Sequence, residues 1–256
     1  MNIEKLLESV NRIESEKAYI VSQLPENTAY LFRGLSLEIE SIRKSLTDEQ
    51  RRMNASKAGY NVEYKAACRL LKQAANNSLK QAWANAKGQI CACDGYVGVR
   101  LTDPKYALPM ANNRVMDLDT IMDTVAQRAT GEENLPDVAD LKTYLKVITA
   151  KYKAEHSAKE LSQIKDRSNG RLPIYYRFES NGAYVSIELL LLALEIVPDG
   201  RAYTSPSTVQ AVYIKGENAE AVVLPIRVTE TTDNVIRADA DSAALRSGTY
   251  FDGIPA

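Results

Sequence analysis

The sequence predicts an α+β protein in which two halves each combine a helix with an antiparallel sheet, after an N-terminal helical hairpin. Three observations favour this class. Apolar residues recur at helical spacing through residues 1–58. The order helix, strand, turn, strand is indicated near residues 62–101, and again near residues 184–228. Two such halves are expected to pair their strands into one sheet system with their helices together on one face.

Composition limits the classes of protein to consider. The chain has 256 residues, enough for one large or two small domains, and its 45% hydrophobic and 25% charged residues are ordinary for a soluble protein. Its formal net charge of −1 provides no global attraction to nucleic acid or to anionic membranes, so any DNA contact requires a local patch.

The expected location is the cytoplasm, with no membrane partner. The first ten residues, MNIEKLLESV, lack the basic and then apolar order of an export signal. The longest apolar run, 187–197, is far shorter than the roughly 20 residues that cross a bilayer. Three cysteines without a disulfide pattern fit a reducing compartment.

The N-terminal region, 1–58, is expected to be a helical hairpin or a short coiled coil. Pro25 interrupts its first apolar pattern, and the second pattern repeats at steps of three or four residues. That second pattern comprises Leu31, Leu35, Ile39, Ile42 and Leu46.

An α+β domain is expected at 61–230, with a helical insertion at 135–165 that is basic on its solvent side, followed by a tail at 231–256. Its first half is a helix from 61 to about 77, two strands around the Lys87–Gly88 turn, and an alternating strand with one buried face at 97–101. A short helix follows near 117–129. The second half comprises strands near 172–186, the apolar helix 187–197 ended by Pro198, and a hairpin around 216–218.

No catalytic constellation stands out, so neither a metal nor a cofactor is expected. The single histidine, His156, excludes a two-histidine metal site. Cys68, Cys91 and Cys93 could join it around zinc, but the spacing is wrong for known zinc motifs, and buried strand cysteines are the favoured reading. The chain has no P-loop, GxGxxG, GxSxG or zincin motif.

Two charged patterns allow more than one interpretation. Asp117, Asp119 and Asp123 could share a cation, although the first two fit the start of a helix, where carboxylates are favourable. Basic residues on one face of the helix at 64–78 could contact phosphates or could simply be solvated. These are Lys65, Arg69 and Lys72.

Two stretches resemble the bacterial sliding clamp, the processivity ring of the replicative DNA polymerase. GAYVSIELLLLALEIVPDG, a hairpin and AVVLPIRV are similar to the last half-domain of that family, whose chain ends on a strand of the type V-M-P-M-R-L. ICACDGYVGVRL is similar to its A-T-D-G-x-R-L strand pair. The resemblance covers about half of the chain and implies a divergent, single clamp-like domain. A clamp reduced to one domain in this way could come from a phage.

The resemblance implies a pocket for short partner peptides and names its walls. Pro225 would lie at a strand edge or beside the groove, with Arg227 at the rim. The wall candidates are Asp94, Gly95, Tyr96, Val222, Leu224, Pro225 and Ile226.

The chain also departs from the clamp pattern. Val97–Gly98 replaces the R-L that follows the D-G turn in clamps. Clamp helices line the ring with basic residues, but the helix at 187–197 is apolar or acidic, as though another part of the protein covers it. The N-terminal hairpin is the candidate for that cover, or for a seam between copies.

The function expected from the resemblance is that of a non-enzymatic replication accessory protein. It would bind double-stranded DNA without sequence preference through Lys65, Arg69 and Lys72, would bind a DNA polymerase or other replication proteins, and would form a homo-oligomer to encircle a duplex. Three alternatives remain. They are an adaptor or decoy that does not encircle DNA, a structural or assembly protein of a phage, and an enzyme with a pocket around Asp94, Tyr96 and Asp103.

Overall fold

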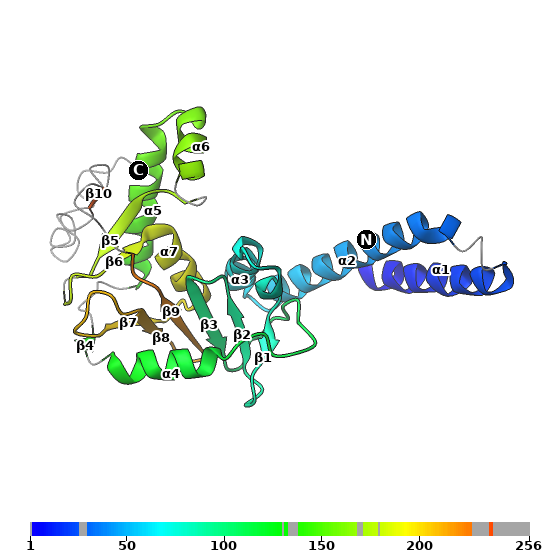
Figure 1. Ribbon diagram of the computed structural model, residues 1–256, viewed down its shortest axis with the longest axis horizontal. Coiled ribbons are helices and arrows are strands. Elements are labelled where there is room, and N and C mark those ends of the chain that lie inside the picture. The colour runs from blue at the N-terminus through cyan, green and yellow to red at the C-terminus, as the bar shows by residue number, and fades with distance from the viewer. Residues whose placement is uncertain are drawn as a thin grey trace. The chain divides into compact units, whose positions relative to one another are not determined.

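The chain divides into two compact units in the computed structural model (Figure 1). The first comprises residues 1–64 and 105–109, and the second comprises 65–104 and 110–256. The structure describes residues 2–25, 30–129, 131–132, 138–167, 171–178, 180–226 and 236–237. Arg227 and the expected tail at 231–256 lie outside these residues, apart from the short strand β10 (Ile236–Arg237).

The first unit contains an antiparallel helical hairpin of α1 (Ile3–Gln23) and α2 (Arg33–Lys57). Asn2 begins α1 by accepting a hydrogen bond from the Lys5 backbone N–H at 3.3 Å, which satisfies one of the free donors at the helix start. Between the helices, Arg43 forms an ion pair with Glu14.

A tyrosine cluster completes the described part of this unit. The ring of Tyr106 lies 6.4 Å from that of Tyr60 and 6.1 Å from that of Tyr64, centroid to centroid. The Tyr64 hydroxyl donates to the Asp48 backbone carbonyl at 3.3 Å. Residues 105–109 therefore belong with the hairpin although they are distant in sequence.

The second unit is built on a seven-stranded antiparallel sheet of order β1-β2-β3-β9-β8-β7-β4. The α+β class is thus confirmed. The strands are β1 (Trp83–Ala84), β2 (Ile90–Cys93), β3 (Val97–Leu101), β4 (Gly131–Glu132), β7 (Arg201–Thr204), β8 (Val212–Lys215) and β9 (Ala219–Val223).

Two similar halves meet at the centre of this sheet. Helix α3 (Asn61–Gln73) precedes β1, β2 and β3, and helix α7 (Ile187–Ile196) precedes β7, β8 and β9. Strands β3 and β9 pair antiparallel, with Val97 opposite Val223. Because an antiparallel pair has a local two-fold axis, the strand order on one side of it repeats on the other.

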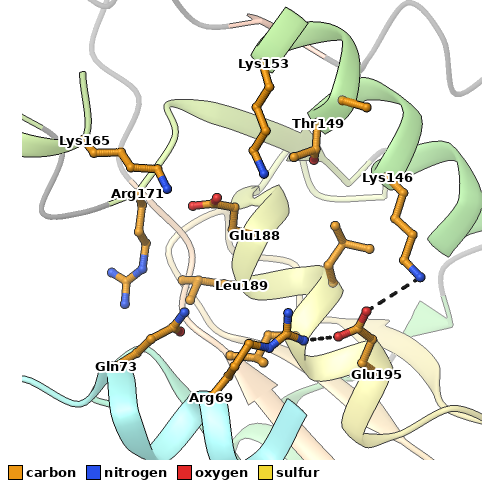
Figure 2. Close-up of a pocket in the computed structure, with 13 residues that line it drawn as sticks. Arg69, Gln73, Lys146, Thr149, Lys153, Lys165, Arg171, Glu188, Leu189 and Glu195 are labelled. Carbon is orange, nitrogen blue, oxygen red and sulfur yellow. Dashed lines mark hydrogen bonds and ion pairs between the residues drawn. The ribbon is translucent and has the colours of Figure 1, made fainter. Parts of the chain in front are cut away.

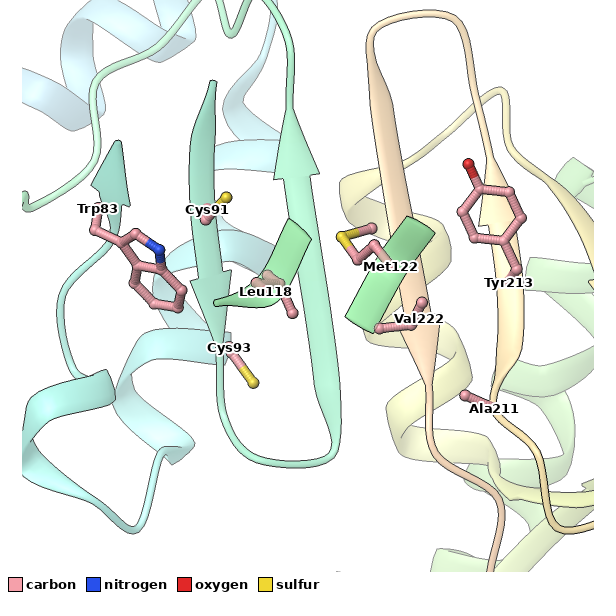
Figure 3. Close-up of a cluster of buried hydrophobic side chains, with 8 residues drawn as sticks. All are labelled: Trp83, Cys91, Cys93, Leu118, Met122, Ala211, Tyr213 and Val222. Carbon is pink, nitrogen blue, oxygen red and sulfur yellow. The ribbon is translucent and has the colours of Figure 1, made fainter. Parts of the chain in front are cut away.

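Both faces of the sheet are covered. Helices α3 and α7 lie behind it and α4 (Leu118–Arg128) lies in front in the view of Figure 3. Every residue of β3 is buried, so the prediction of a single buried face for this strand was wrong. Gly98 shows how tightly α4 packs, since a Cβ atom there would lie 2.7 Å from Leu118 Cδ1.

The core under α4 joins side chains from both halves (Figure 3). Trp83 and the two cysteines of β2 come from the first half, and Tyr213 and Val222 come from the second. Leu118 and Met122 project from α4 between them. Packing of this kind is the main stabilising term for a sheet covered on both faces.

The remaining elements lie at the α7 end of the unit. Helix α5 (Val138–Ala154) packs on α7, and α6 (Ala158–Arg167) follows it. A smaller sheet of order β10-β5-β6 contains β5 (Ile174–Arg177) and β6 (Tyr184–Ser186), and a 3₁₀ turn lies at Asn77–Leu79. Helix α5, from the insertion, thus supplies cover for α7, for which the hairpin was one candidate. Among the described residues no helix is long and apolar enough to cross a membrane.

Candidate functional site

The exposed face of α3 carries the basic residues singled out in the sequence. Lys65, Arg69 and Lys72 are all exposed. The opposite face packs inward and is buried: Ala66, Ala67, Leu70 and Leu71. The helical period therefore separates the two sets and places the three cations on the solvent side of the helix.

Helix α7 is almost wholly apolar and buried, and each of its two carboxylates has a hydrogen-bond or ion-pair partner. Glu188 and Glu195 are seven residues apart and lie on one face of the helix. Glu188 accepts a hydrogen bond from the Leu172 backbone N–H at 3.0 Å, which fixes the segment after α6. Glu195 forms ion pairs with Arg69 of α3 and with Lys146 of α5, the latter at 3.7 Å.

A cleft of about 570 Å³ lies among α3, α5, α6 and α7, and we call it the basic cleft (Figure 2). Five cationic side chains line it against the two carboxylates of α7, an excess of three positive charges. Figure 2 shows Lys153 extending from α5 towards the centre, where Glu188 lies. The cations are Arg69, Lys146, Lys153, Lys165 and Arg171.

Two of these cations are available to a ligand. Lys153 and Lys165 have no ion-pair partner within the described part of the chain. An ammonium group without a carboxylate partner keeps its full attraction for a phosphate, and a wall of such groups concentrates anions. The basic cleft is therefore suited to a polyanion.

Arg171 connects the basic cleft to the turn between β2 and β3. Its guanidinium donates to Asp94 Oδ2 at 3.2 Å and lies 4.1 Å from the ring centroid of Tyr96. The Asp94 side chain is fully buried, and its Oδ1 accepts from the backbone N–H groups of Tyr96 and Val97 at 2.8 and 2.7 Å. Gly95, at φ 99°, allows the turn. Asp94 is thus committed to the turn and to Arg171.

The other residues of the expected peptide pocket are divided between core and surface. Val222 is buried in the core under α4, whereas Leu224 and Tyr96 are exposed and Pro225 and Ile226 are half-buried. The Leu224 N–H donates to the Tyr96 carbonyl at 2.9 Å, so these two residues are cross-strand neighbours just beyond the paired part of β3 and β9. The Ile226 N–H donates to Tyr184.

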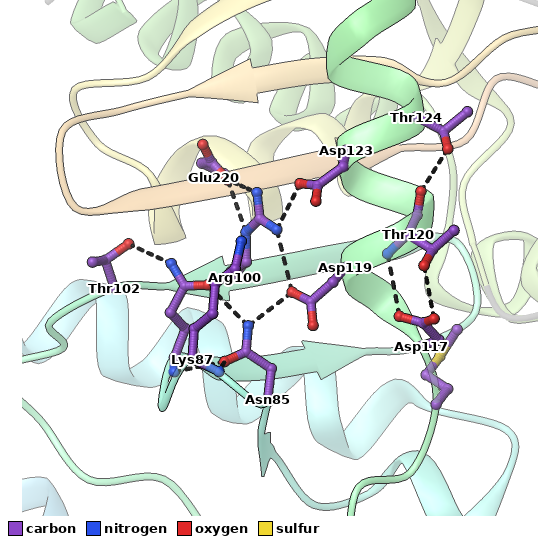
Figure 4. Close-up of polar contacts among 12 residues, drawn as sticks. Asn85, Lys87, Arg100, Thr102, Asp117, Asp119, Thr120, Asp123, Thr124 and Glu220 are labelled. Atoms are coloured by element: carbon purple, nitrogen blue, oxygen red, sulfur yellow. Dashed lines mark hydrogen bonds and ion pairs between the residues drawn. The ribbon is translucent and has the colours of Figure 1, made fainter.

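A second polar cluster surrounds Arg100 under α4 (Figure 4). The side chain is 9% exposed and pairs with Asp119 at 3.2 Å, Asp123 at 2.9 Å and Glu220 at 2.6 Å. Burial opposes the charged form, but these hydrogen bonds outweigh it and raise the pKa of Arg100.

The neighbouring carboxylates serve the fold. Asp117 is the N-cap of α4 and accepts hydrogen bonds from the backbone N–H and the hydroxyl of Thr120, in agreement with the helix-start interpretation. Glu220 also accepts from Tyr213 at 2.7 Å, and burial together with this bond raises the pKa of the tyrosine. The cluster binds α4 to the sheet.

The cysteines and the histidine lie on different elements. Cys91 and Cys93 are buried in β2, and burial raises the pKa of Cys91 to about 12 and also raises that of Cys93. Cys68 lies on α3. His156 follows α5, where its ring stacks on Tyr152 at 4.4 Å. Among the described residues, no group of three or more His, Cys, Asp or Glu side chains could hold a metal ion.

Of the five cations of the basic cleft, the sequence singled out only Arg69 by number, and it indicated three others only as part of the basic stretch 135–165. A signal was present for α5, because Lys146 and Lys153 are seven residues apart and so share a helix face. For Arg171 no local signal exists, since its role depends on Asp94, which is 77 residues away.

Comparison of the chain with models of known protein families, with curated proteins and with solved structures gives no significant match. The functional argument therefore depends on the geometry and charge of the chain itself.

Proposed function

We propose that this protein is a non-enzymatic, clamp-type α+β protein that binds the sugar-phosphate backbone of double-stranded DNA in the basic cleft, without reading base sequence. The observation that carries the proposal is the gathering of five cations against two lining carboxylates in that cleft, where Lys153 and Lys165 have no ion-pair partner among the described residues, within a chain whose net charge is −1. A protein without an overall positive charge needs such a local cluster of cations to attract the phosphates of DNA.

The arrangement of the sheet supports the clamp-type part of the proposal. Two halves, each a helix followed by three strands, meet at the β3–β9 pair, as the sequence resemblance leads one to expect of a clamp domain. In this chain α5 packs on α7, so DNA cannot lie over α7. In the proposed complex, α3 and the cations of α5 and α6 that line the cleft make the phosphate contacts instead.

The cleft cations would act as point charges on phosphate oxygens. Lys153 and Lys165 meet phosphate directly, whereas Arg69 and Lys146 must exchange part of their attraction to Glu195 for the new anion. Such contacts fix the position of a duplex but carry no sequence information. We extend the proposal to the binding of a DNA polymerase or other replication proteins. The protein would do this either as a ring around DNA or as an adaptor.

The test is binding of a fluorescent duplex, measured by anisotropy across a salt series. Lys153→Ala with Lys165→Ala should weaken binding about tenfold and reduce the slope of log K against log salt by up to about 2, because two phosphate contacts are lost. The matched control is Lys87→Ala with Lys215→Ala, which removes two exposed lysines of the same unit that lie outside the cleft. Equal affinities for both variants, or no duplex binding by the unaltered protein at low salt, would refute the proposal.

Peptide binding beside the β2–β3 turn is a second candidate function. It is favoured by two neighbouring exposed apolar side chains, Tyr96 at 40% and Leu224 at 41%. A synthetic clamp-binding peptide should bind the unaltered protein and should not bind a Tyr96→Ala, Leu224→Ala variant in a fluorescence titration. The Val209→Ala variant, which also loses an exposed apolar side chain, is the control.

A further inference from the structure

The helical hairpin of the first unit has almost no core of its own. The only buried residues of α1 and α2 are Ile3, Ile39 and Ala55, although the helices contain 21 and 25 residues. Two helices alone bury too little apolar surface to be stable, so most of their stability must come from further packing.

The seam between the two helices is regular. Residues that face the opposite helix recur along α1 at 3, 7, 10, 14, 17 and 21. On the other side of the seam they recur at the N-cap position 32 and along α2 at 36, 39, 43, 46 and 50, and all are buried or half-buried. This is the spacing of a coiled-coil stripe.

A second stripe lies beside the seam on each helix. In α1, Leu6, Ile13 and Ile20 each come one residue before a seam position, and in α2 Leu35 and Ile42 do the same. Because the helices run antiparallel, an equal rotation from the seam on each brings both stripes to the same side of the hairpin. These five residues, with Leu31, which precedes position 32 in the same way, form what we call the apolar face, and each is at least 37% exposed.

Charge along the hairpin points to a particular occupant. The half near the loop, 14–23 and 33–42, has four carboxylates and two cations, whereas the opposite half, 3–13 and 43–57, has four carboxylates and seven cations. A second hairpin laid antiparallel on the first would place each net-negative half against a net-positive half. A parallel arrangement would bring like charges together.

We propose that the apolar face is the dimer interface of this protein, and that a second copy of the chain docks on it antiparallel to form a four-helix bundle. The two-fold axis then passes near Ile13 and Ile42, which lie at the level where the charge changes sign. Helices of this length present a face about 30 Å long and roughly 20 Å wide, which approaches the roughly 800 Å² that each partner buries in a stable complex. This inference does not depend on DNA binding, which uses the other unit.

The test is the mass in solution by light scattering, combined with circular dichroism to follow helix content. The unaltered chain should have twice its mass of 28.4 kDa at micromolar concentration. Ile13→Glu with Ile42→Glu should give a monomer, because four carboxylates would meet at the axis, and helix content should fall as the hairpin loses that packing. The matched control, Tyr19→Glu with Leu37→Glu, adds the same charge to more exposed positions off the apolar face and should remain a dimer. A monomeric unaltered chain, or a dimer that survives the Ile13 and Ile42 substitutions, overturns the proposal.

A cross-linking experiment tests the antiparallel orientation. In a Cys68→Ser background, Ile13→Cys should cross-link to its copy with a short bismaleimide, because both copies of position 13 lie near the axis. Ile20→Cys should not, because the two copies of position 20 would be about 20 Å apart along the bundle. Efficient cross-linking at both positions would mean a parallel dimer and would contradict the charge argument.

Discussion

At the scale of single residues, Glu195 limits the positive charge of the basic cleft. It holds Arg69 and Lys146 in ion pairs, and its side chain is 15% exposed. The carboxylate fixes the two cations, but it also repels any phosphate that approaches them. Such pairs, with one partner largely exposed, contribute little to stability, about 0–1 kcal/mol.

We therefore predict that Glu195→Gln binds duplex DNA more tightly. Glutamine keeps the shape and a hydrogen-bond acceptor but removes the repulsion, which is about 1 kcal/mol for unit charges 4 Å apart in water, or roughly fivefold in Kd. Anisotropy at low salt is the measurement, and Glu217→Gln on the β8–β9 turn is the control. Weaker binding by the Glu195 variant would show that this carboxylate organises the site more than it opposes the ligand.

Arg100 gives the second prediction at this scale, for stability. Replacing it by methionine leaves three carboxylates close together under α4 without their shared partner, and we expect a loss of about 3–5 kcal/mol in the free energy of unfolding. Arg114→Met, at an arginine that is 43% exposed, should cost less than about 1 kcal/mol. Urea unfolding of both variants compares them, and equal midpoints would contradict the prediction.

At the scale of elements, helices α4 and α7 are held in place by different interactions. Helix α4 begins at the Asp117 cap and is held by Arg100, whereas α7 is held by burial of nearly all of its side chains. Strand β2 carries two buried cysteines, and Cys91 belongs to the core that α4 covers. Access to these thiols therefore reports whether α4 stays in place.

We predict that the three cysteines react at different rates with Ellman's reagent at pH 8. Cys68, which is partly exposed, should react first, and Cys91 and Cys93 should react only as fast as the unit opens, because burial disfavours their thiolates. The pKa of Cys91 is raised from 9.0 to about 12, so its contribution to stability is complete below pH 9 and is lost as the pH rises towards 12. Three equally fast thiols at pH 8 would contradict the packing of α4.

At the scale of the whole molecule, the net charge of −1 means that DNA is attracted only where cations gather. The exposed ridge of α3 adjoins the basic cleft through Arg69, so the two form one positive surface. Surfaces of this kind bind all sequences alike and lose affinity steeply with salt.

We predict that replacing Lys65, Arg69 and Lys72 together by alanine weakens duplex binding about equally for several unrelated sequences. The salt slope should fall by up to about 3, because three phosphate contacts are lost. Anisotropy with four duplexes of different sequence makes the comparison, and the Lys87, Lys215 double variant again serves as the control. Loss of binding to one sequence only would indicate base recognition instead.

The sequence by itself determined the α+β class, the helical hairpin and the basic face of α3. All three follow from periodicity within a single segment, because a period of 3.6 or 2 residues decides which side chains share a face. The N-cap at Asp117 was readable for the same reason, since its partner Thr120 lies three residues away.

Only the tertiary structure decided what surrounds these elements. Arg171 meets Asp94, Arg100 meets Glu220, and Arg69 meets Glu195 across 77, 120 and 126 residues of chain. Both faces of β3 are buried because α4 comes back over the sheet, and α7 is packed against α5. Local periodicity carries no information on which distant faces pack together, because that packing depends on how the whole chain buries its apolar surface. The basic cleft forms only when α3, α5, α6 and α7 have packed in this way.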